Sequence, residues 1–344
     1  MTAAFPGKFF LTPNPAAVGE YLTSKGWLSP NESVYTVVRA GEGNMNCVLR
    51  VTTSSRAFIL KQARPWVEKY PGVAAPWDRA LMEARFYREV ERHPEVAAYL
   101  PKLLGLDVEE RLLILENLPE ARDFTFVYSD AARPPEESEL DRLVDFLISL
   151  HTACRNPELA LTFRNMEMRL LNHEHIFALP LRKDNGLDLD TITPGLSLPA
   201  LRLLNDPEYC RQVDSLGERY LDTSQGPCLL HGDYFPGSWL RSEKRIIVID
   251  PEFCFYGPPE WDLGVMMAHL YFIRHPQASS QASIDRLFSR YEQSAPLNRS
   301  LALQFAGAEI MRRILGVAQL PAAFSLERKA QLLSRSRELV GLLH

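Results

Sequence analysis

The hydrophobic pattern of this chain changes near residues 116–119, and this change limits the folds that it can adopt. Before it, short β-rich runs are separated by turn residues, as in an antiparallel meander: 35–38, 47–51 and 57–61. After it, residues recur at the spacing of a helical stripe: Leu140, Leu143, Val144, Leu147 and His151. The sequence therefore predicts an α+β protein with a small β-rich part, residues 1–118, and a larger, mainly helical part, residues 119–344.

The other expected elements follow from the same periodicities. In the first part we expect a helix over 77–93 and a hairpin formed by 103–108 and 112–115. In the second part we expect two short strands, 228–230 and 246–249. Helices are expected over 200–221, 261–274, 282–294, 298–319 and 325–343, and 183–199 is expected to be an exposed loop.

The charge balance argues against nucleic acid as the main partner. Lys and Arg total 38 and Asp and Glu total 43 in 344 residues, which gives a formal net charge of -5. Binding to a phosphate backbone usually needs a basic surface. We therefore expect any anionic ligand to be held by a few local cations.

Several features predict a cytoplasmic protein without a membrane span. The first residues lack the basic region and long apolar run of a signal peptide. No stretch approaches about 18 uninterrupted apolar residues. The cysteines are scattered and never spaced as CxxC, which disfavours disulfides and structural zinc: Cys47, Cys154, Cys210, Cys228 and Cys254.

Two acidic motifs in the second part carry the most specific chemical pattern. The first is His-Gly-Asp, in which Asp233 follows an apolar run and is expected on a loop at a strand end. The second, Asp-Pro-Glu, follows another apolar run, and in an extended segment Asp250 and Glu252 would share one face. Two carboxylates suit Mg²⁺, which bridges to substrate phosphates. Asp233 would then accept or orient the proton of an attacking hydroxyl.

The first motif is a weak signal by itself, because Asp in a turn more often caps the local backbone. The downstream Asp-x-Glu motif at the end of an apolar strand favours the catalytic interpretation. We assign His231 an orienting role, since a histidine beside a strand end usually ties loops together by hydrogen bonds.

Phosphoryl transfer also needs a cation on the nucleotide phosphates, and Lys61 is the candidate. It ends an apolar strand that would bring its ammonium group to an interior cleft, although a lysine at a strand end is more often a solvated edge residue. Glu83, on the expected helix that follows, is the preferred partner, as in the Lys–Glu pair of kinase folds. Glu89 and Glu91 are rivals on the same helix.

A glycine-bearing stretch, residues 41–46, lies between two strands, which disfavours the phosphate loops that open a helix. It fits a flap whose backbone amides cover nucleotide phosphates, with a plain hairpin turn as the alternative. The candidate residues of this flap are Gly41, Gly43, Asn44 and Asn46. Glu116 and Leu118, where the two parts join, would offer backbone groups to an adenine edge.

Arg312 and Arg313 lie in the expected helix over 298–319. Neighbouring residues on a helix point about 100° apart, so at most one of the two is expected to face the core. Without further context, ordinary solvation at the surface is the simpler interpretation.

Together these motifs resemble those of the aminoglycoside phosphotransferase and choline kinase group, and within it those of the 5-methylthioribose kinases. The resemblance covers the chain from about residue 35 to 320 and rests on Ser238 and these segments: 41–46, 61–63, 230–233, 250–258 and 312–314. The wider group usually has Asn where Ser238 stands, whereas the methylthioribose kinases have Ser. One departure is Tyr234-Phe235, where the family usually has Leu-His.

The resemblance implies a bilobal, protein-kinase-like fold with a nucleotide-binding N-terminal lobe and a catalytic, substrate-binding C-terminal lobe. It implies transfer of the ATP γ-phosphate to a hydroxyl of a small substrate, 5-methylthioribose or a related sugar, with Mg²⁺. Asp233 would be the base, Asp250 and Glu252 the metal ligands, and Lys61 the phosphate cation with Glu83 its partner.

The family also implies further contacts and an assembly. Arg312 and Arg313 would contact the sugar, Ser238 would have an orienting role, and a homodimer would form. No nucleic acid or membrane partner is expected.

Two alternatives stay open. The same machinery would serve an aminoglycoside or amino alcohol, and the acidic cluster at 134–139 could then bind a polycation, although it also suits a helix N-terminus. The other alternative is a nucleotide-binding pseudokinase that acts as a scaffold. The joint presence of Lys61, Asp233, Asp250 and Glu252 argues against a protein that only binds.

Overall fold

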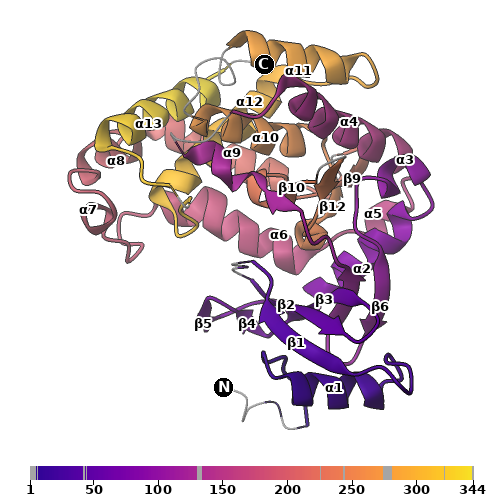
Figure 1. Ribbon diagram of the computed structural model, residues 1–344. Coiled ribbons are helices and arrows are strands. Elements are labelled where there is room, and N and C mark those ends of the chain that lie inside the picture. Colours follow the sequence, from indigo (N-terminus) through magenta and orange to yellow (C-terminus); the bar gives the residue numbers. More distant parts are fainter. Residues whose placement is uncertain are drawn as a thin grey trace. The chain divides into compact units, whose positions relative to one another are not determined.

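A computed structural model describes residues 5, 7–41, 43, 45–129, 134–224, 226–242, 245–273, 281–320 and 322–342. The chain divides into two compact units, Met1–Glu120 and Ala121–His344, close to the junction that the sequence predicts after residue 118. Strands dominate the first unit and helices the second (Figure 1), which confirms the expected α+β class.

The first unit is built on a five-stranded antiparallel sheet in the order β1-β2-β3-β7-β6, with a small β4–β5 ribbon beside it. Its elements are α1 Pro15–Ser24, β1 Val34–Arg39, β2 Asn46–Thr53, β3 Ala57–Ala63, β4 Trp66–Val67, β5 Tyr70–Ala74, α2 Arg79–Val90, α3 Pro94–Ala97, β6 Leu103–Asp107 and β7 Leu112–Glu116. The expected hairpin is present, since β6 pairs with β7. The helix α1 is an element that the sequence analysis missed.

One face of this sheet packs on α1, and alternation along the strands decides which side chains lie there. Leu49, Val51, Phe58 and Leu60 are buried in one cluster with Leu22 of α1. The expectation that Lys61 ends its strand is wrong, because β3 continues to Ala63 and pairs on both sides, with β2 and β7. Lys61 is therefore an interior residue of a central strand.

The second unit consists mainly of helices around two small sheets, β11-β10-β8 and β12-β9. Its strands are β8 Arg122–Asp123, β9 Cys228–Leu230, β10 Trp239–Arg241, β11 Ile246–Val248 and β12 Phe255–Gly257. Its α-helices are α4 Glu137–Ala153, α5 Leu159–Thr162, α6 Met166–His173, α7 Leu189–Ile192, α8 Ser197–Leu204, α9 Pro207–Leu221, α10 Glu260–Phe272, α11 Gln281–Glu292, α12 Arg299–Leu315 and α13 Leu326–Val340. Single turns of tighter or wider helix lie at Phe124–Tyr128, Glu174–Ala178, Leu179–Leu181, Pro236–Ser238 and Pro251–Phe253.

Two expectations for this unit need correction. The expected helix over 200–221 is two helices, because Asp206 caps α9 by accepting from the amides of Glu208 and Tyr209, and Pro207 opens the helix. The expected loop 183–199 contains α7 and the start of α8, although most of its residues are exposed as predicted.

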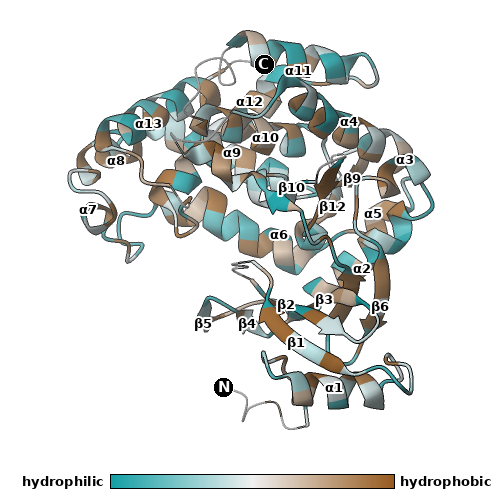
Figure 2. Cartoon of the chain, viewed as in Figure 1, coloured by the Kyte–Doolittle hydropathy of each residue, from teal (hydrophilic) through white to brown (hydrophobic). Residues whose placement is uncertain are grey.

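The core of the second unit lies around α10 and α12. Every residue of α10 is buried, and α12 packs against both α10 and α13. At Gly264 a Cβ atom would lie 2.6 Å from the carbonyl oxygen of Ala302, so glycine permits the close approach of α10 and α12. Figure 2 shows the contrast between apolar α10 and the more hydrophilic α13.

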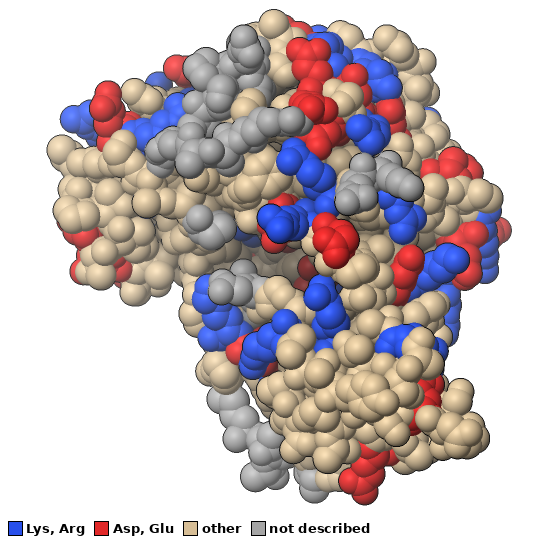
Figure 3. Space-filling model, in the orientation of Figure 1, with Lys and Arg blue, Asp and Glu red and all other residues tan. Residues whose placement is uncertain are grey.

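The surface carries charges of both signs. Acidic and basic side chains are interspersed over the face that Figure 3 shows. None of the helices in the described ranges has the length and apolar character needed to cross a bilayer. The described residues include all five cysteines, and each of these is a free thiol.

Candidate active site

The first unit brings Lys61 and Glu83 together. Lys61 Nζ on β3 lies 2.7 Å from Glu83 Oε2 on α2, and both side chains are buried. Of the rival acids, Glu89 pairs instead with Arg92 at 2.7 Å, and Glu91 is exposed. A buried ion pair of this kind fixes the position of an ammonium group with respect to the sheet.

Arg79, the first residue of α2, was missed by the sequence analysis. It is buried, and its guanidinium donates to Asn46 Oδ1 at 3.1 Å and to the carbonyl oxygen of Met45 at 2.8 Å. It also donates to the carbonyl oxygen of Arg64, just after β3. Arg79 therefore ties the end of the glycine-bearing loop to the helix that carries Glu83, and the Asn46 side chain takes part in this tie.

The remaining nucleotide candidates lie in two places. Gly41 has a φ of +77° with open space at its Cβ position, whereas a Cβ at Gly43 would lie 3.3 Å from the carbonyl oxygen of Asn46. Asn44 falls outside the described residues. Glu116 ends β7, and Leu118 follows as a half-buried residue.

In the second unit, the His-Gly-Asp turn is in direct backbone contact with Phe253, the residue that follows the Asp-Pro-Glu segment. Gly232 has a φ of +88°, and a Cβ there would lie 2.0 Å from the carbonyl oxygen of Phe253. The strands on either side, β9 and β12, are paired. The two acidic motifs thus lie next to each other, and this close approach depends on the glycine within the first motif.

Asp262, near the start of α10, binds the backbone of the His-Gly-Asp turn. The sequence analysis also missed this residue. Its fully buried carboxylate accepts from the amide of His231 at 2.7 Å and from the amide of Gly232 at 2.9 Å. His151 of α4 approaches the same carboxylate at 3.2 Å. The signal for Asp262 was its place next to a long apolar run of the same helix, residues 263–268, where a buried charge must have partners.

His231 and Ser238 occupy orienting positions. His231 Nε2 lies 2.9 Å from the carbonyl oxygen of Ile249, and Ser238 Oγ donates to the carbonyl oxygen of Asp233 at 3.1 Å. The amide of Ile249 in turn donates to the carbonyl oxygen of Ser238 at 2.9 Å. These bonds join the loop that carries Asp233 to the residue before Asp250.

The prediction that Asp250 and Glu252 follow each other in an extended segment is wrong. The strand β11 ends at Val248, Asp250 is left-handed with a φ of +64°, and Pro251–Phe253 form a single 3₁₀ turn. Asp250 is half-buried and Glu252 is buried. Asn165, itself left-handed, holds this turn by donating to the carbonyl oxygens of Glu252 and Cys254, each at 2.9 Å.

The expectation that at most one of Arg312 and Arg313 faces the core is also wrong, as is their simpler interpretation as solvated surface residues. Both are buried on α12, and both approach the carboxylate of Asp233: Arg312 Nη2 lies 3.4 Å from Oδ1 and Arg313 Nη2 lies 3.7 Å from it. Glu309, one turn earlier, pairs with both arginines. A shared acid at i−3 and i−4 draws two adjacent long side chains to one place.

The residues after Asp233 have structural tasks. The Tyr234 hydroxyl donates to the carbonyl oxygen of Leu143 at 2.9 Å, and its ring is fully buried. The Phe235 ring lies 4.6 Å from the Arg313 guanidinium, a cation–π contact. The pair that departs from the usual family residues thus anchors the loop and supports one of the arginines.

The protonation of Asp233 is set by two opposing effects. Burial raises the pKa of its carboxyl group, and the charges of Arg312 and Arg313 hold back this rise. A carboxylate with a raised pKa is a better proton acceptor than an ordinary surface aspartate.

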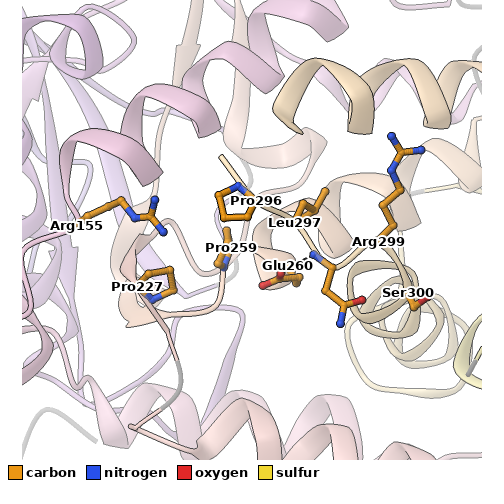
Figure 4. A pocket seen from close by; sticks show the side chains of 9 residues that line it. Arg155, Pro227, Pro259, Glu260, Pro296, Leu297, Arg299 and Ser300 are labelled. Carbon is orange, nitrogen blue, oxygen red and sulfur yellow. Dashed lines mark hydrogen bonds between the residues drawn. The ribbon is translucent and has the colours of Figure 1, made fainter. Parts of the chain in front are cut away.

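A separate hollow of about 590 Å³ lies elsewhere on the second unit. Figure 4 shows Arg155, Glu260 and Arg299 at its wall, with several prolines between them. None of the candidate site residues named above lines this hollow, so we do not assign it to the candidate active site.

Replacing Gly232 with alanine is expected to destabilise the second unit by about 3 kcal/mol or more, because the new methyl group would collide with backbone and adopt a left-handed φ. Gly26→Ala is the matched control, since Gly26 has a φ of +70° with no atom within 4 Å of its Cβ position. The control is expected to lose only about 1 kcal/mol. Chemical unfolding measures both, and equal losses would contradict the proposed close packing.

Burial lowers the pKa of His269, on α10, from 6.5 to about 4. Between these values the unfolded chain binds the proton more readily than the folded one, so stability falls as the pH falls through this window. Replacing His269 with glutamine is expected to reduce this slope by up to about 1.4 kcal/mol per pH unit. The measurement is the free energy of unfolding from pH 7 to 4.5, and an unchanged slope would show that His269 does not remain neutral.

Comparison with known proteins finds relatives whose sequences align with nearly the whole chain. Methylthioribose kinase of Exiguobacterium sibiricum is 26% identical over 351 residues, covering 91% of this chain and 87% of that protein. Methylthioribose kinase of Geobacillus sp. (strain WCH70) is 25% identical, covering 94% and 91%.

Two solved structures share the fold. Choline kinase LicA from Streptococcus pneumoniae has a TM-score of 0.53 at 14% identity, covering 94% of this chain and 98% of that one. A spectinomycin phosphotransferase in complex with ADP and spectinomycin has a TM-score of 0.53 at 12% identity, covering 96% and 98%. The protein-kinase-like fold that the resemblance implies is thus confirmed.

The family itself follows from a model that matches residues 36–297, well over half of the chain. By this match, the chain belongs to the phosphotransferase enzyme family.

Proposed function

We propose that this protein is an ATP-dependent small-molecule kinase that phosphorylates a hydroxyl of 5-methylthioribose or a related neutral sugar. One observation carries the proposal. Asp233 lies beside two buried arginines of α12, and the turn that carries Asp233 is in backbone contact with Phe253, directly after Asp250 and Glu252. Membership of a phosphotransferase family and the methylthioribose kinase relatives support the same conclusion.

The chain's own residues suggest how the reaction runs. Asp233 accepts or orients the proton of the acceptor hydroxyl, and the acceptor oxygen attacks the γ-phosphorus of ATP. The bond between that phosphorus and the β–γ bridging oxygen breaks, so that ADP leaves and the acceptor becomes a phosphate ester. His231 and Ser238 keep the loop of Asp233 in place through the contacts described above.

Asp250 and Glu252 are the proposed ligands of Mg²⁺. Their donor set, two carboxylates on a short rigid turn, suits a hard cation that prefers oxygen. The described residues contain no group of three or more His, Cys, Asp or Glu side chains placed to hold a metal. Water and substrate phosphates would complete the coordination, and a bound Mg²⁺ would neutralise charge on the phosphates.

The first unit supplies the proposed nucleotide contacts. Lys61, held by Glu83, would bind the phosphates, and the loop with Gly41, Gly43, Asn44 and Asn46 would cover them. Backbone groups at Glu116 and Leu118 would bind the adenine edge. The roles of these residues are proposals based on the resemblance and on the Lys61–Glu83 pair.

The charges around Asp233 favour a neutral acceptor. The guanidinium groups of Arg312 and Arg313 lie within 4 Å of its carboxylate. Among the described residues, Glu309 is the one further acid that contacts them, and it is already paired with both. A polycationic aminoglycoside or a choline-type cation would approach these two guanidinium groups and would find no additional carboxylate beside them to bind its charge. A polyhydroxy sugar can accept hydrogen bonds from the same guanidinium groups.

We place the reaction in the cytoplasm, where ATP is available and where free thiols such as the five found here persist. A homodimer stays a prediction from the family resemblance.

A panel of acceptors tests the proposed substrate class. ADP release is measured with methylthioribose, ribose, choline and kanamycin at matched concentrations. We expect turnover with methylthioribose or ribose and little with the two cations, because Arg312 and Arg313 repel them. Faster ADP release with choline or kanamycin would favour the alternative acceptors. ATP binding without ADP release on any of the four compounds would favour a pseudokinase.

Replacing Asp233 with asparagine tests the base. We expect kcat to fall by about 10²- to 10⁴-fold, because the side chain keeps its shape but no longer accepts a proton. ATP binding, measured as the rise in melting temperature that ATP causes, is expected to change little. Asp214→Asn is the matched control, since Asp214 is exposed on α9 and its loss is expected to leave turnover unchanged. Near-normal turnover of the Asp233 variant would show that another group serves as base.

A further inference from the structure

Glu309 is a fully buried acid that the proposed chemistry does not use. It lies on α12 and binds both arginines of the candidate site: Oε2 lies 2.8 Å from Arg312 Nε, and Oε1 lies 2.7 Å from Arg313 Nε. The two guanidinium groups in turn reach Asp233. Glu309 and Asp233 therefore hold the arginine pair from opposite sides.

A second layer holds Glu309 itself. His269 Nε2 of α10 lies 3.2 Å from Glu309 Oε1, and the Tyr128 hydroxyl lies 2.6 Å from His269 Nδ1. An ionised carboxylate can only accept, so His269 donates through Nε2 and accepts from Tyr128 at Nδ1. This assigns one tautomer to a neutral His269 and gives the carboxylate a third fixed donor.

The electrostatic balance explains why Glu309 is ionised. Burial alone would raise the pKa of its carboxyl group, but the charges of Arg312 and Arg313 outweigh burial and hold the pKa well below its ordinary value. With His269 neutral, two buried cations face two carboxylates, Glu309 and Asp233. Removing Glu309 would leave one acid for two arginines, which is costly in a buried site.

One donor atom of Arg313 is not used in the hydrogen bonds among the described residues. Arg313 Nη2 is buried and forms no hydrogen bond with the described residues, and it lies 3.7 Å from Asp233 Oδ1. A buried donor without a hydrogen bond beside a candidate base is a natural contact for an acceptor hydroxyl. The Phe235 ring, 4.6 Å from the guanidinium, limits where this donor can move.

From these contacts we infer that Glu309 is a positioning residue for acceptor recognition: it holds Arg312 and Arg313 so that their guanidinium groups converge on Asp233 and on the hydroxyl to be phosphorylated. Tyr128 and His269 hold Glu309 in turn. This inference rests on the proposed kinase function and deepens it, because it explains how two adjacent helical residues serve a single substrate.

The decisive variant is Glu309→Asp, which keeps the charge but withdraws the carboxylate by one methylene. If Glu309 positions the arginines, kcat/KM for the acceptor falls at least about 10-fold, since small displacements at a reacting centre are costly. The KM for ATP stays within about twofold of wild type, because the proposed nucleotide contacts do not involve α12. If charge balance alone matters, Glu309→Asp behaves as wild type, and the inference is overturned.

The control is the same substitution at Glu139. This buried acid of α4 pairs with one arginine, Arg241, at 2.7 Å and also accepts from the amide of Glu136 at 2.8 Å. It is thus a buried acid bound to an arginine, like Glu309, but among the described residues it has no contact with Arg312 or Arg313. Glu139→Asp is expected to leave both kinetic constants within about twofold of wild type. An equal loss in the control would mean that the effect is general loosening of the unit, and would overturn the inference.

A double-variant cycle tests whether Glu309 acts through the arginines. Arg313→Lys alone and Glu309→Asp alone are each expected to lower kcat/KM for the acceptor. The kcat/KM of the double variant is expected to be no more than about threefold below that of the less active single variant. Losses that multiply would show independent action and contradict the inference. Unfolding measured on the same four proteins reports the coupling without any turnover.

This design separates the two hypotheses. If the wild-type protein phosphorylates no acceptor on the panel, the proposed function fails, whereas the unfolding cycle still tests whether Glu309 and Arg313 are coupled. If wild type is active and the variants are as active, only the positioning role fails.

Discussion

The carboxylate of Asp262 is the interaction on which the candidate catalytic turn depends. It is fully buried at the start of α10 and accepts from the amides of His231 and Gly232, so it fixes the backbone just before Asp233. The indole of Trp261 adds a bond to the carbonyl oxygen of Gly232 at 2.9 Å. Because a buried charge without partners is so costly, the turn and the helix form together or not at all. Asp233, the proposed base, is thus anchored to the core of its unit although it lies on a loop.

Buried acids on helices also hold two other groups of candidate residues. Glu83 fixes Lys61 within the first unit, and Glu309 fixes two arginines within the second. Each uses a buried acid on a helix to orient cations whose long side chains would otherwise sample many rotamers. Buried ion pairs add little net stability, since desolvation offsets their attraction. Their value here is geometric, because phosphoryl transfer is catalysed chiefly by positioning and electrostatics.

Short-range patterns predicted most of the fold, and they failed where tertiary contacts decide. Strand alternation and helical stripes predicted the β-rich first part and most helices of the second. Asp250 was placed wrongly because a left-handed residue before proline has no signature in apolar periodicity. The arginine pair was misjudged because helical geometry alone separates neighbours by about 100°, and only Glu309 one turn away brings them together. Asp262 and Arg79 act on backbone groups, which a sequence does not display.

If Arg312 and Arg313 contact the acceptor, as we propose, they would link the choice of acceptor to the strength of Asp233 as a base. Arg312 and Arg313 oppose the rise that burial causes in the pKa of Asp233, and the same two groups stand where an acceptor would approach it. A cationic acceptor would therefore meet repulsion at the point where its proton must leave. A neutral hydroxyl would instead share the guanidinium donors with Asp233, and in doing so would weaken their interaction with the carboxylate. Substrate binding of this kind would strengthen the proposed base only when the correct acceptor is present, and would couple recognition to proton transfer through one pair of side chains.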